Sequence, residues 1–558
     1  MDWNGTVLQS ETGAGTAAYR QYGKYFIIAY FTGKYKALCA KAAPLAHRGG
    51  LCYNEAKERE YGRACGAVCG RGERAMNHNL ICKVMGLTLV LEGACMLLPL
   101  VVSLLYGERS VAFVFCTAAV FCTVFGLLLL CLQQERKEKI QVREGFFAVA
   151  FSWIVISVFG AAPYWMCGVF PNVMDALFES VSGFTTTGAT LIADVEALPR
   201  GLLFWRSLTQ WLGGMGVLVL TLALLPKLGA GSIFLLRAES PGPIKTKLAP
   251  KIGQNAKILY YIYIILTAAE AVCLRIAGMG WYDSLVHAMS TVATGGFSSR
   301  SASLGFYNSL AVNVIVVAFM LLSSLNFTVL YLVLIRRTMR FRDNAEIRIY
   351  FRMLLAVMVL ISLDLMLHSG LGALESIGHA VFQTVSVSST TAFASTDFGQ
   401  WPAFSQMLLL LLMAVGGCSA STAGGIKVQR FTLLFRIMHR QLHSVIHPRV
   451  VRTICVDGRR VEEPVLTAAS LYFFSYIVII LLLAAVSSVD GHTLGTSLSA
   501  AIACVSNTGT GVELAGPAST FNVFSAPTKL FFCFGMLAGR LEIMPILLLF
   551  FPSVWSNR

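Results

Sequence analysis

Residues 178–190 read FESVSGFTTTGAT, and the triplet Thr186-Thr187-Gly188 within this stretch decides the fold because it is repeated. An apolar or small-residue run leads into it, from Phe178 to Phe184, and similar runs lead into three further copies. The four copies are Thr186-Thr187-Gly188, Ala293-Thr294-Gly295, Thr390-Thr391-Ala392 and Asn507-Thr508-Gly509. Because the copies recur at a step of about 100 residues, the sequence predicts a fourfold internal repeat.

Each copy lies between two long apolar runs, and about 20 apolar residues are enough for a helix to cross the hydrocarbon core. The turn at each triplet would therefore lie inside the membrane. Backbone without helical hydrogen bonds is tolerated there only where it lines a cavity, and glycine allows left-handed angles without a side-chain clash. Four such turns around one axis would present carbonyl oxygens inward, as in a filter that replaces the hydration shell of K⁺.

The composition points to the same class of protein. The 558 residues are 56% hydrophobic and 13% charged, which excludes a set of water-soluble domains and predicts a polytopic membrane protein. The net charge of +15 arises largely from Lys and Arg between the apolar runs, within residues 136–143, 227–257, 336–352 and 427–460. By the positive-inside rule these stretches are cytoplasmic and the triplets face outward, so the charge indicates topology and not a nucleic-acid partner.

The chain can be divided along its length. Residues 1–75 contain no run long enough to span and are left unassigned, as a disordered tail or as sequence upstream of the true start. An extra two-helix domain is expected at 76–132, pore repeats at 133–230, 250–336, 346–430 and 464–553, and a basic cytoplasmic loop at 431–463. Each repeat should consist of a helix, a half-helix, a turn and a return helix. The expected return helices are 202–226, 310–335, 403–428 and 528–551, which gives about ten full-length transmembrane helices.

Three longer stretches accompany the triplets: FWRSLTQWLGGMG at 204–216, GGCSASTAGGIKV at 416–428 and AGRLE at 538–542. In this order they resemble the TrkH/KtrB superfamily of K⁺ transporters over about residues 84–552. The extra helix pair favours the TrkH branch, because KtrB lacks it. The expected fold is thus an all-α integral membrane protein with four membrane-pore-membrane repeats in pseudo-fourfold arrangement around one pore.

The resemblance also implies function and partners. It implies K⁺ uptake across the plasma (inner) membrane, a homodimer among membrane lipid, and a cytoplasmic TrkA-like ring that binds nucleotide and NAD(H). K⁺ would be the transported ion, and no organic cofactor is expected in this chain. The sequence shows no nucleotide site, catalytic triad or metal cluster, so we expect no enzyme. Whether K⁺ moves alone or by symport with H⁺ or Na⁺ stays open.

The filter residues follow from the triplets. We expect the potassium filter to comprise Thr186, Thr187, Gly188, Ala293, Thr294, Gly295, Thr390, Thr391, Ala392, Asn507, Thr508 and Gly509. Ala392 stands where the family usually has glycine, and its Cβ makes a positive φ unfavourable by roughly 1 kcal/mol or more. Either three glycines suffice, or the protein is a Na⁺-permeable or Na⁺-coupled transporter of the KtrB type.

A gate is expected beneath the filter. Gly416, Gly417, Gly424 and Gly425 interrupt an apolar run at about mid-membrane, where helix breakers need a cavity to line; the alternative is a packing kink. Arg540 lies in the last apolar run, where an arginine is costly unless it is paired or wet. We expect it to face the pore as an electrostatic barrier, or else to be neutralised by Glu270 or Asp364.

Overall fold

The computed structural model describes residues 78–132, 142–216, 252–337, 340–450 and 452–550. Residues 76–558 form one compact unit. The expected N-terminal extension, residues 1–75, lies outside the described residues, as do most of the basic stretches at 136–143 and 227–257.

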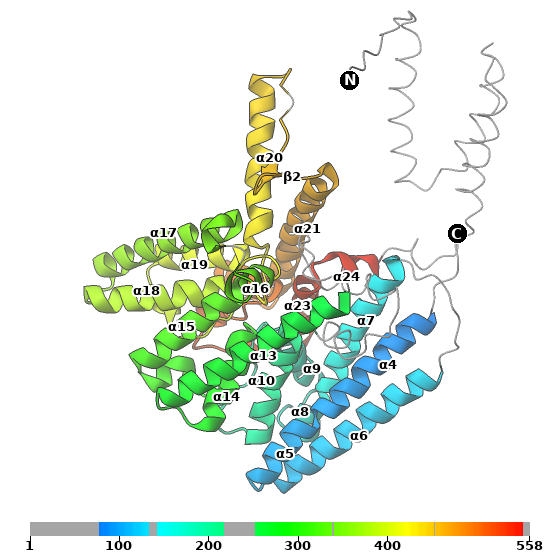
Figure 1. The fold of residues 1–558 in the computed structure, drawn as a ribbon. Coiled ribbons are helices and arrows are strands. Elements are labelled where there is room, and N and C mark those ends of the chain that lie inside the picture. Colours follow the sequence, from blue (N-terminus) through cyan, green and yellow to red (C-terminus); the bar gives the residue numbers. More distant parts are fainter. Residues whose placement is uncertain (1–77, 133–141, 217–251, 338–339, 451, 551–558) are drawn as a thin grey trace, which may run out of the picture. The chain divides into compact units, whose positions relative to one another are not determined.

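Helices make up most of this unit (Figure 1). The extra domain contains α4 (His78–Cys95), α5 (Leu97–Leu105) and α6 (Arg109–Cys131). The first repeat contains α7 (Val142–Gly160), α8 (Ala162–Met166), α9 (Val173–Phe184) and α10 (Arg200–Gly214). The second contains α13 (Ile252–Ile276), α14 (Trp281–Val292), α15 (Leu310–Ser324) and α16 (Phe327–Leu334). The third contains α17 (Ala345–His368), α18 (Ala373–Ser388) and α19 (Ala403–Val415), and the fourth α21 (Glu463–Ser488), α22 (Leu494–Val505), α23 (Ala526–Arg540) and α24 (Met544–Leu548).

The repeat order is the one that the sequence predicts. Each repeat places a long helix first, then a short helix that ends at its triplet (α9, α14, α18 or α22), then a return helix (α10, α15, α19 or α23). The extra domain packs on the first repeat through contacts of α4 with α7. The expected fold class, an all-α membrane protein built from four pore repeats, is confirmed.

Local sequence explains where the return helices begin. Pro199 and Pro402 precede α10 and α19 as N-caps, and the hydroxyl of Ser309 accepts a hydrogen bond from the Val312 N–H at the start of α15. Proline fixes a φ that suits the start of a helix, and serine satisfies one of the free N–H groups there. The apolar residues that follow then pack against the pore helices.

The return helices are shorter than expected. They contain 15, 15, 13 and 15 residues, or about 20 Å at 1.5 Å per residue, against about 30 Å of hydrocarbon. The prediction of unbroken helices in the second and fourth repeats was wrong. The second breaks after Ser324, and α16 is turned by 106°. The fourth breaks after Arg540, with positive φ at Glu542 and Ile543.

These breaks also correct the number of full-length spans. Among the described residues, six helices are long and apolar enough to cross a membrane, or seven if the bent pair α15–α16 counts as one. The four return helices account for the difference from the expected ten. After the second, third and fourth return helices the described chain leaves the helix, whereas residues 217–226, the expected continuation of the first, lie outside the described residues.

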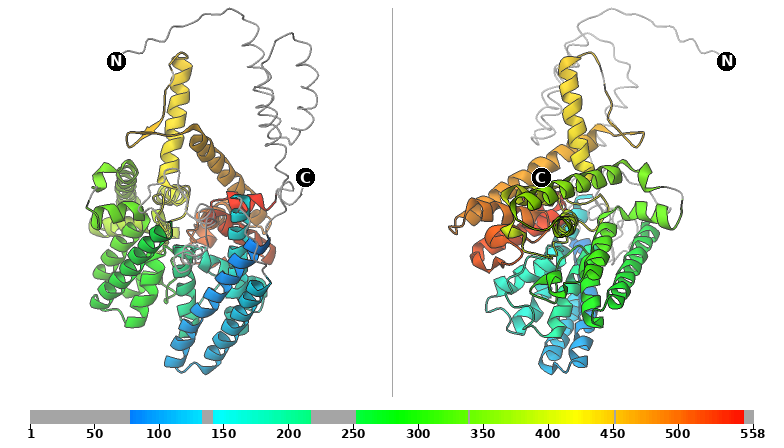
Figure 2. Two further views of the ribbon diagram at one scale, coloured as in Figure 1. Left: turned by 45° about the vertical axis from the view of Figure 1, so that its right-hand side comes forward. Right: turned by 90° about the vertical axis from the view of Figure 1, so that its left-hand side faces the viewer.

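A further helix and a β-hairpin follow the third repeat. Helix α20 (Val428–Ile446) extends away from the other helices of this unit in all three views (Figures 1 and 2). A hairpin of β1 (Cys455–Val456) and β2 (Arg459–Arg460) follows, with Asp457 and Gly458 at positive φ in its turn. Asp-Gly is a favoured pair for such a two-residue turn.

Candidate functional site

The four triplet turns share one backbone conformation. Each turn comprises the four residues that follow its pore helix, as Thr185 to Gly188 follow α9. The N–H of the third residue donates to the carbonyl oxygen five residues earlier: Thr187 to Ser182, Gly295 to Ser290, Thr391 to Ser386 and Thr508 to Ala503, at 2.8–3.0 Å. The residue before it is left-handed in every copy, as at Thr186 (φ 54°) and Asn507 (φ 54°). In three copies this residue is threonine, and a left-handed β-branched residue is rare and costs about 1–3 kcal/mol. Asn507 in the fourth copy adopts this region more readily. Strain repeated at the same position indicates a functional site.

This conformation corrects the register of the second copy. Left-handed residues occur at Thr294 and Gly296, where the first copy has Thr186 and Gly188. The matching triplet is therefore Thr294-Gly295-Gly296, one residue later than Ala293-Thr294-Gly295. Ala293 instead corresponds to Thr185, because each donates its N–H four residues back.

The four copies abut one another in the order fourth, first, second, third, and form a ring of turns that lines one space. A Cβ placed on Gly188 would lie 2.2 Å from the carbonyl oxygen of Gly295, so the first copy abuts the second. A Cβ on Gly296 would lie 2.0 Å from the carbonyl oxygen of Thr391 in the third copy. A Cβ on Gly509 would lie 2.1 Å from the carbonyl oxygen of Thr187, which joins the fourth copy to the first. The turns thus meet through main-chain oxygens at equivalent positions.

At the fourth position of the turn, the third copy has alanine where the other three copies have glycine. Ala392 occupies the place of Gly188, Gly296 and Gly509, and it too is left-handed. Its φ is 55°, whereas the three glycines have φ values of 83–84°. The alanine therefore adopts the left-handed region at an angle nearer to its standard minimum, and the ring departs from fourfold symmetry at this point.

A small outer chamber lies on one side of the ring. Its volume is about 80 Å³, and its lining includes the ring residues Gly188, Gly296, Ala392 and Gly509. The predicted meeting of the four copies about one space is thus present in the structure. The pore helices α9, α14, α18 and α22 end at these turns, and the C-terminal end of a helix carries partial negative charge. The ring therefore favours a cation.

Arginines near the outer chamber are paired with carboxylates. Arg206 and Glu179 form a buried ion pair at 2.9 Å, with side chains 2% and 0% exposed. Glu179 also accepts hydrogen bonds from the Thr190 hydroxyl and the Leu191 N–H, which fixes the segment that leaves the first turn. Arg300 pairs with Glu196 and Asp283. These ion pairs hold the residues around the chamber in place, and the carboxylates offset the positive charge of the arginines.

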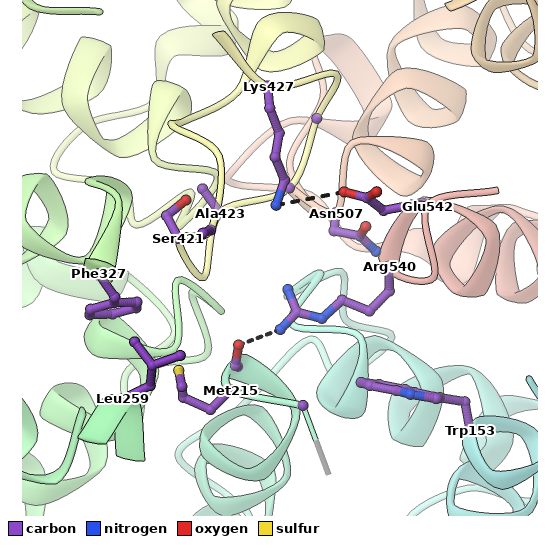
Figure 3. Close-up of a pocket in the computed structure, with 16 residues that line it drawn as sticks. Trp153, Met215, Leu259, Phe327, Ser421, Ala423, Lys427, Asn507, Arg540 and Glu542 are labelled. Carbon is purple, nitrogen blue, oxygen red and sulfur yellow. Dashed lines mark hydrogen bonds and ion pairs between the residues drawn. The ribbon is translucent and has the colours of Figure 1, made fainter. Parts of the chain in front are cut away.

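A second chamber, of about 90 Å³, lies on the opposite side of the ring. The segment 416–427, which joins α19 to α20, contributes much of its lining together with Asn507, Arg540 and Glu542. Figure 3 shows Arg540 reaching across this inner chamber toward the end of α10, and Lys427 directed at Glu542. The break lies where the glycine pattern predicts it, and a nonhelical segment of this length is more than a kink.

Hydrogen bonds hold this segment, which corresponds to the predicted intramembrane loop, against residues in or next to three of the triplet turns. The Gly424 N–H donates to the Thr390 hydroxyl at 2.8 Å, and the Gly425 N–H donates to the Ser506 carbonyl at 3.0 Å. The Thr422 hydroxyl donates to the Val292 carbonyl at 3.1 Å. A Cβ on Gly424 would lie 2.0 Å from the Ser506 carbonyl oxygen, which explains the glycine there. The loop occupies the space directly beneath the ring.

Arg540 ties the loop to the first repeat. Its guanidinium donates to the carbonyl oxygens of Thr422 in the loop (2.9 Å) and of Gly213 and Gly214 at the end of α10 (2.5 and 2.6 Å). Neither Glu270 nor Asp364 is among its described hydrogen-bond partners. Asp364 instead binds Ser405 and His368. Arg540 lies at the end of α23 rather than inside an unbroken helix, and it lines the inner chamber.

Sequence reasoning missed a charge cluster beside this chamber. Glu542 pairs with Arg430 at 2.5 Å and with Lys427 at 3.9 Å, and so joins the break after α23 to the start of α20. Gln210, which lies within the stretch at 204–216, donates to the Gly295 carbonyl oxygen in the second triplet turn. The available signal was the position of these polar residues inside or beside apolar runs.

Comparisons with known proteins agree with this geometry. The family model for TrkH, a cation transport protein, matches residues 111–557. The Trk system potassium uptake protein TrkH of Vibrio parahaemolyticus is 38% identical over 495 residues, which cover 86% of this chain and 100% of that protein. The Trk system potassium uptake protein TrkG of Escherichia coli strain K12 is 36% identical over 483 residues, which cover 86% and 99%.

A solved structure matches as well. The crystal structure of the potassium transporter TrkH from Vibrio parahaemolyticus superposes with a TM-score of 0.77 at 34% identity, over 86% of this chain and 100% of that chain. These relatives are named for transport rather than for catalysis. With its apolar spans, the chain is a multi-pass membrane protein. It belongs to the TrkH family of cation transport proteins.

Proposed function

We propose that this chain takes up K⁺ through the ring formed by the four filter turns. The observation that carries the proposal is that all four turns line one chamber and that three glycines each face a carbonyl oxygen of a neighbouring copy. Main-chain oxygens can replace the hydration shell of K⁺. The names of the relatives, which are potassium uptake proteins, support the same ion.

The intramembrane loop and Arg540 would form the gate. A positive charge beneath a cation filter opposes passage, and the loop fills the space below the ring. A shift of the loop that released Thr422 from Arg540 would open the inner chamber. Because Lys427 at the end of the loop is followed directly by α20, movement of α20 could pull on the loop.

The partners follow from the same arrangement. We propose a homodimer in the inner membrane, with the outer chamber facing away from the cytoplasm, and a cytoplasmic TrkA-like nucleotide-binding ring as regulator. The basic residues of α20 and of segment 336–352 would lie on the cytoplasmic side. Helix α20 extends away from the other helices (Figure 2), so a regulatory partner bound to it would move the loop.

Flux measurements test the proposal. The purified chain is reconstituted into liposomes, with and without its regulatory partner, and ⁸⁶Rb⁺ and ²²Na⁺ uptake are compared. We expect Rb⁺ uptake well above that of empty liposomes, competed by K⁺ and only weakly by Na⁺. Absence of selective Rb⁺ uptake under both conditions would contradict the proposal.

One observation favours a second candidate, a Na⁺-permeable or Na⁺-coupled transporter. Ala392 adopts a φ of 55° where the other ring positions have 83–84°, so one side of the ring differs in geometry. The same assay separates the candidates. Comparable Rb⁺ and Na⁺ uptake, or Rb⁺ uptake that requires Na⁺, would favour the second.

A further inference from the structure

The second filter turn lacks the pair of hydroxyl groups that braces the first and third turns. Hydroxyl groups at its first and third positions pair across the turn in the first and third copies: Thr185 with Thr187, and Ser389 with Thr391, each at 2.8 Å. The fourth copy has Ser506 and Thr508 at these positions, but the Ser506 hydroxyl pairs with the Tyr476 hydroxyl at 2.7 Å instead. The second copy has Ala293 and Gly295, so no hydroxyl is available at either position.

Gln210 occupies the vacant space. This residue of α10 belongs to the first repeat, and it is fully buried. A Cβ placed on Gly295 would lie 2.4 Å from Gln210 Cδ and 2.5 Å from its Oε1. The glycine and the glutamine are therefore complementary, because the amide fills the volume that a threonine side chain would take.

The amide also binds the backbone on both sides of Gly296. Gln210 Nε2 donates to the carbonyl oxygen of Gly295 at 2.6 Å, and Gln210 Oε1 accepts from the Phe297 N–H at 3.1 Å. The Gly295 oxygen is the ring oxygen that faces Gly188 at the junction of the first and second copies. One side chain thus fixes a filter oxygen and the residue that follows the turn.

We infer that Gln210 is a positioning residue for ion selectivity in the second filter turn. Its N–H holds the Gly295 carbonyl in place, as the hydroxyl pairs hold the first and third turns. An amide does this without a net charge, whereas a lysine or arginine at this position would repel the cation. A carbonyl oxygen has two lone pairs, so the hydrogen bond leaves one for an ion. This inference rests on the proposed function.

The test compares two glutamines on return helices. Gln210→Met keeps the volume but removes both hydrogen bonds. The matched control is Gln406→Met in α19, where the amide binds the carbonyls of Gly399 and Trp401 outside the filter. In liposomes we expect Gln210→Met to lower the Rb⁺/Na⁺ uptake ratio by about three- to tenfold, as the loss of the one hydrogen bond that holds the Gly295 carbonyl oxygen implies. Gln406→Met should leave the ratio unchanged.

The outcomes separate this inference from the proposed function. If the unmodified chain shows no selective Rb⁺ uptake, the proposed function fails. If the unmodified chain is selective and Gln210→Met changes Rb⁺ and Na⁺ uptake in parallel, with the ratio intact, the role of Gln210 is only structural and the inference is overturned.

A second variant probes the same contact from the filter side. Gly295→Ala places a Cβ against the Gln210 amide and should lower the ratio to a similar degree. Because both changes act on one contact, the double variant Gln210→Met/Gly295→Ala should lose less than the losses of Gln210→Met and Gly295→Ala combined. Fully additive losses would contradict the inference.

Discussion

The outer chamber is lined by equivalent residues of the four copies, whereas the inner chamber is lined by residues that differ from copy to copy. The outer chamber takes an equivalent residue from each of the four copies, Gly188, Gly296, Ala392 and Gly509. The inner chamber takes a loop from the third copy and an arginine from the fourth. Repeated backbone suits the recognition of a spherical ion, whereas a single movable segment suits control of passage. Changes in the ring should therefore alter which ion passes, and changes in the inner chamber should alter how much passes.

The largest effect is expected at the ring. In Gly188→Ala the new Cβ would lie 2.2 Å from the Gly295 carbonyl oxygen, and the residue would also keep an unfavourable φ of 84°. Such a contact forces the junction of two copies apart, and the left-handed angle alone costs about 1–2 kcal/mol. We expect K⁺-selective Rb⁺ uptake to fall at least tenfold in liposomes.

The control for this change is Gly168→Ala. Gly168 has a similar φ of 72°, and a Cβ there would meet nothing within 4 Å. This variant carries the left-handed strain without the ring contact, so its uptake should match that of the unmodified chain. Equal losses in the two variants would show that strain, and not the ring, explains the result.

Arg540→Ala should have the opposite effect, on flux alone. The change removes the hydrogen bonds to Thr422, Gly213 and Gly214 and the positive charge beneath the filter. A hydrogen bond from a charged group contributes about 1.5–3 kcal/mol. Loss of the one bond that holds the loop, to Thr422, should therefore raise Rb⁺ uptake about tenfold while the Rb⁺/Na⁺ ratio stays constant. Uptake at the level of the unmodified chain would argue for a purely structural arginine.

Ala392→Gly is expected to sharpen selectivity. Without a Cβ, residue 392 can adopt the φ of 83–84° found at the other three ring positions. The relief of about 1 kcal/mol corresponds to a Rb⁺/Na⁺ ratio about fivefold higher, measured by paired isotope uptake. A ratio that does not change would mean that three glycines already suffice.

The smallest effect is expected at the edge of the inner chamber. Glu542→Gln leaves Arg430 and Lys427 without their carboxylate partner. Removal of one member of a mostly buried pair weakens folding, so thermal unfolding of the detergent-solubilised protein should shift downward by a few degrees. Rb⁺ uptake should change by less than about threefold. A changed Rb⁺/Na⁺ ratio would contradict the claim that changes in the inner chamber alter only how much passes.

The fold was predictable because its signals are carried by side chains. Four small-residue triplets between apolar runs indicate the repeats, and the glycines at 416–425 mark the loop. The register of the second copy could not be predicted from the sequence, because Ala293-Thr294-Gly295 and Thr294-Gly295-Gly296 both resemble the other triplets. Only the backbone angles at Thr294 and Gly296 distinguish them.

The breaks in the return helices and the partners of Arg540 were harder to predict. The apolar run of the second repeat continues past Ser324, and its one warning is Asn326, whose side chain caps α16 by accepting from the N–H groups of Thr328 and Val329. Arg540 binds carbonyl oxygens that belong to segments far away in sequence. A backbone carbonyl has no signature in the amino-acid sequence, so only the fold reveals such contacts.

The central claim is that four backbone turns surround one cation. Anomalous diffraction from crystals grown in Rb⁺ tests it most directly. We predict a Rb⁺ peak on the axis between the carbonyl oxygens of Thr187, Gly295, Thr391 and Thr508, and loss of that peak in Gly188→Ala. A protein that carries Rb⁺ in liposomes but shows its Rb⁺ peaks away from this ring would contradict the account.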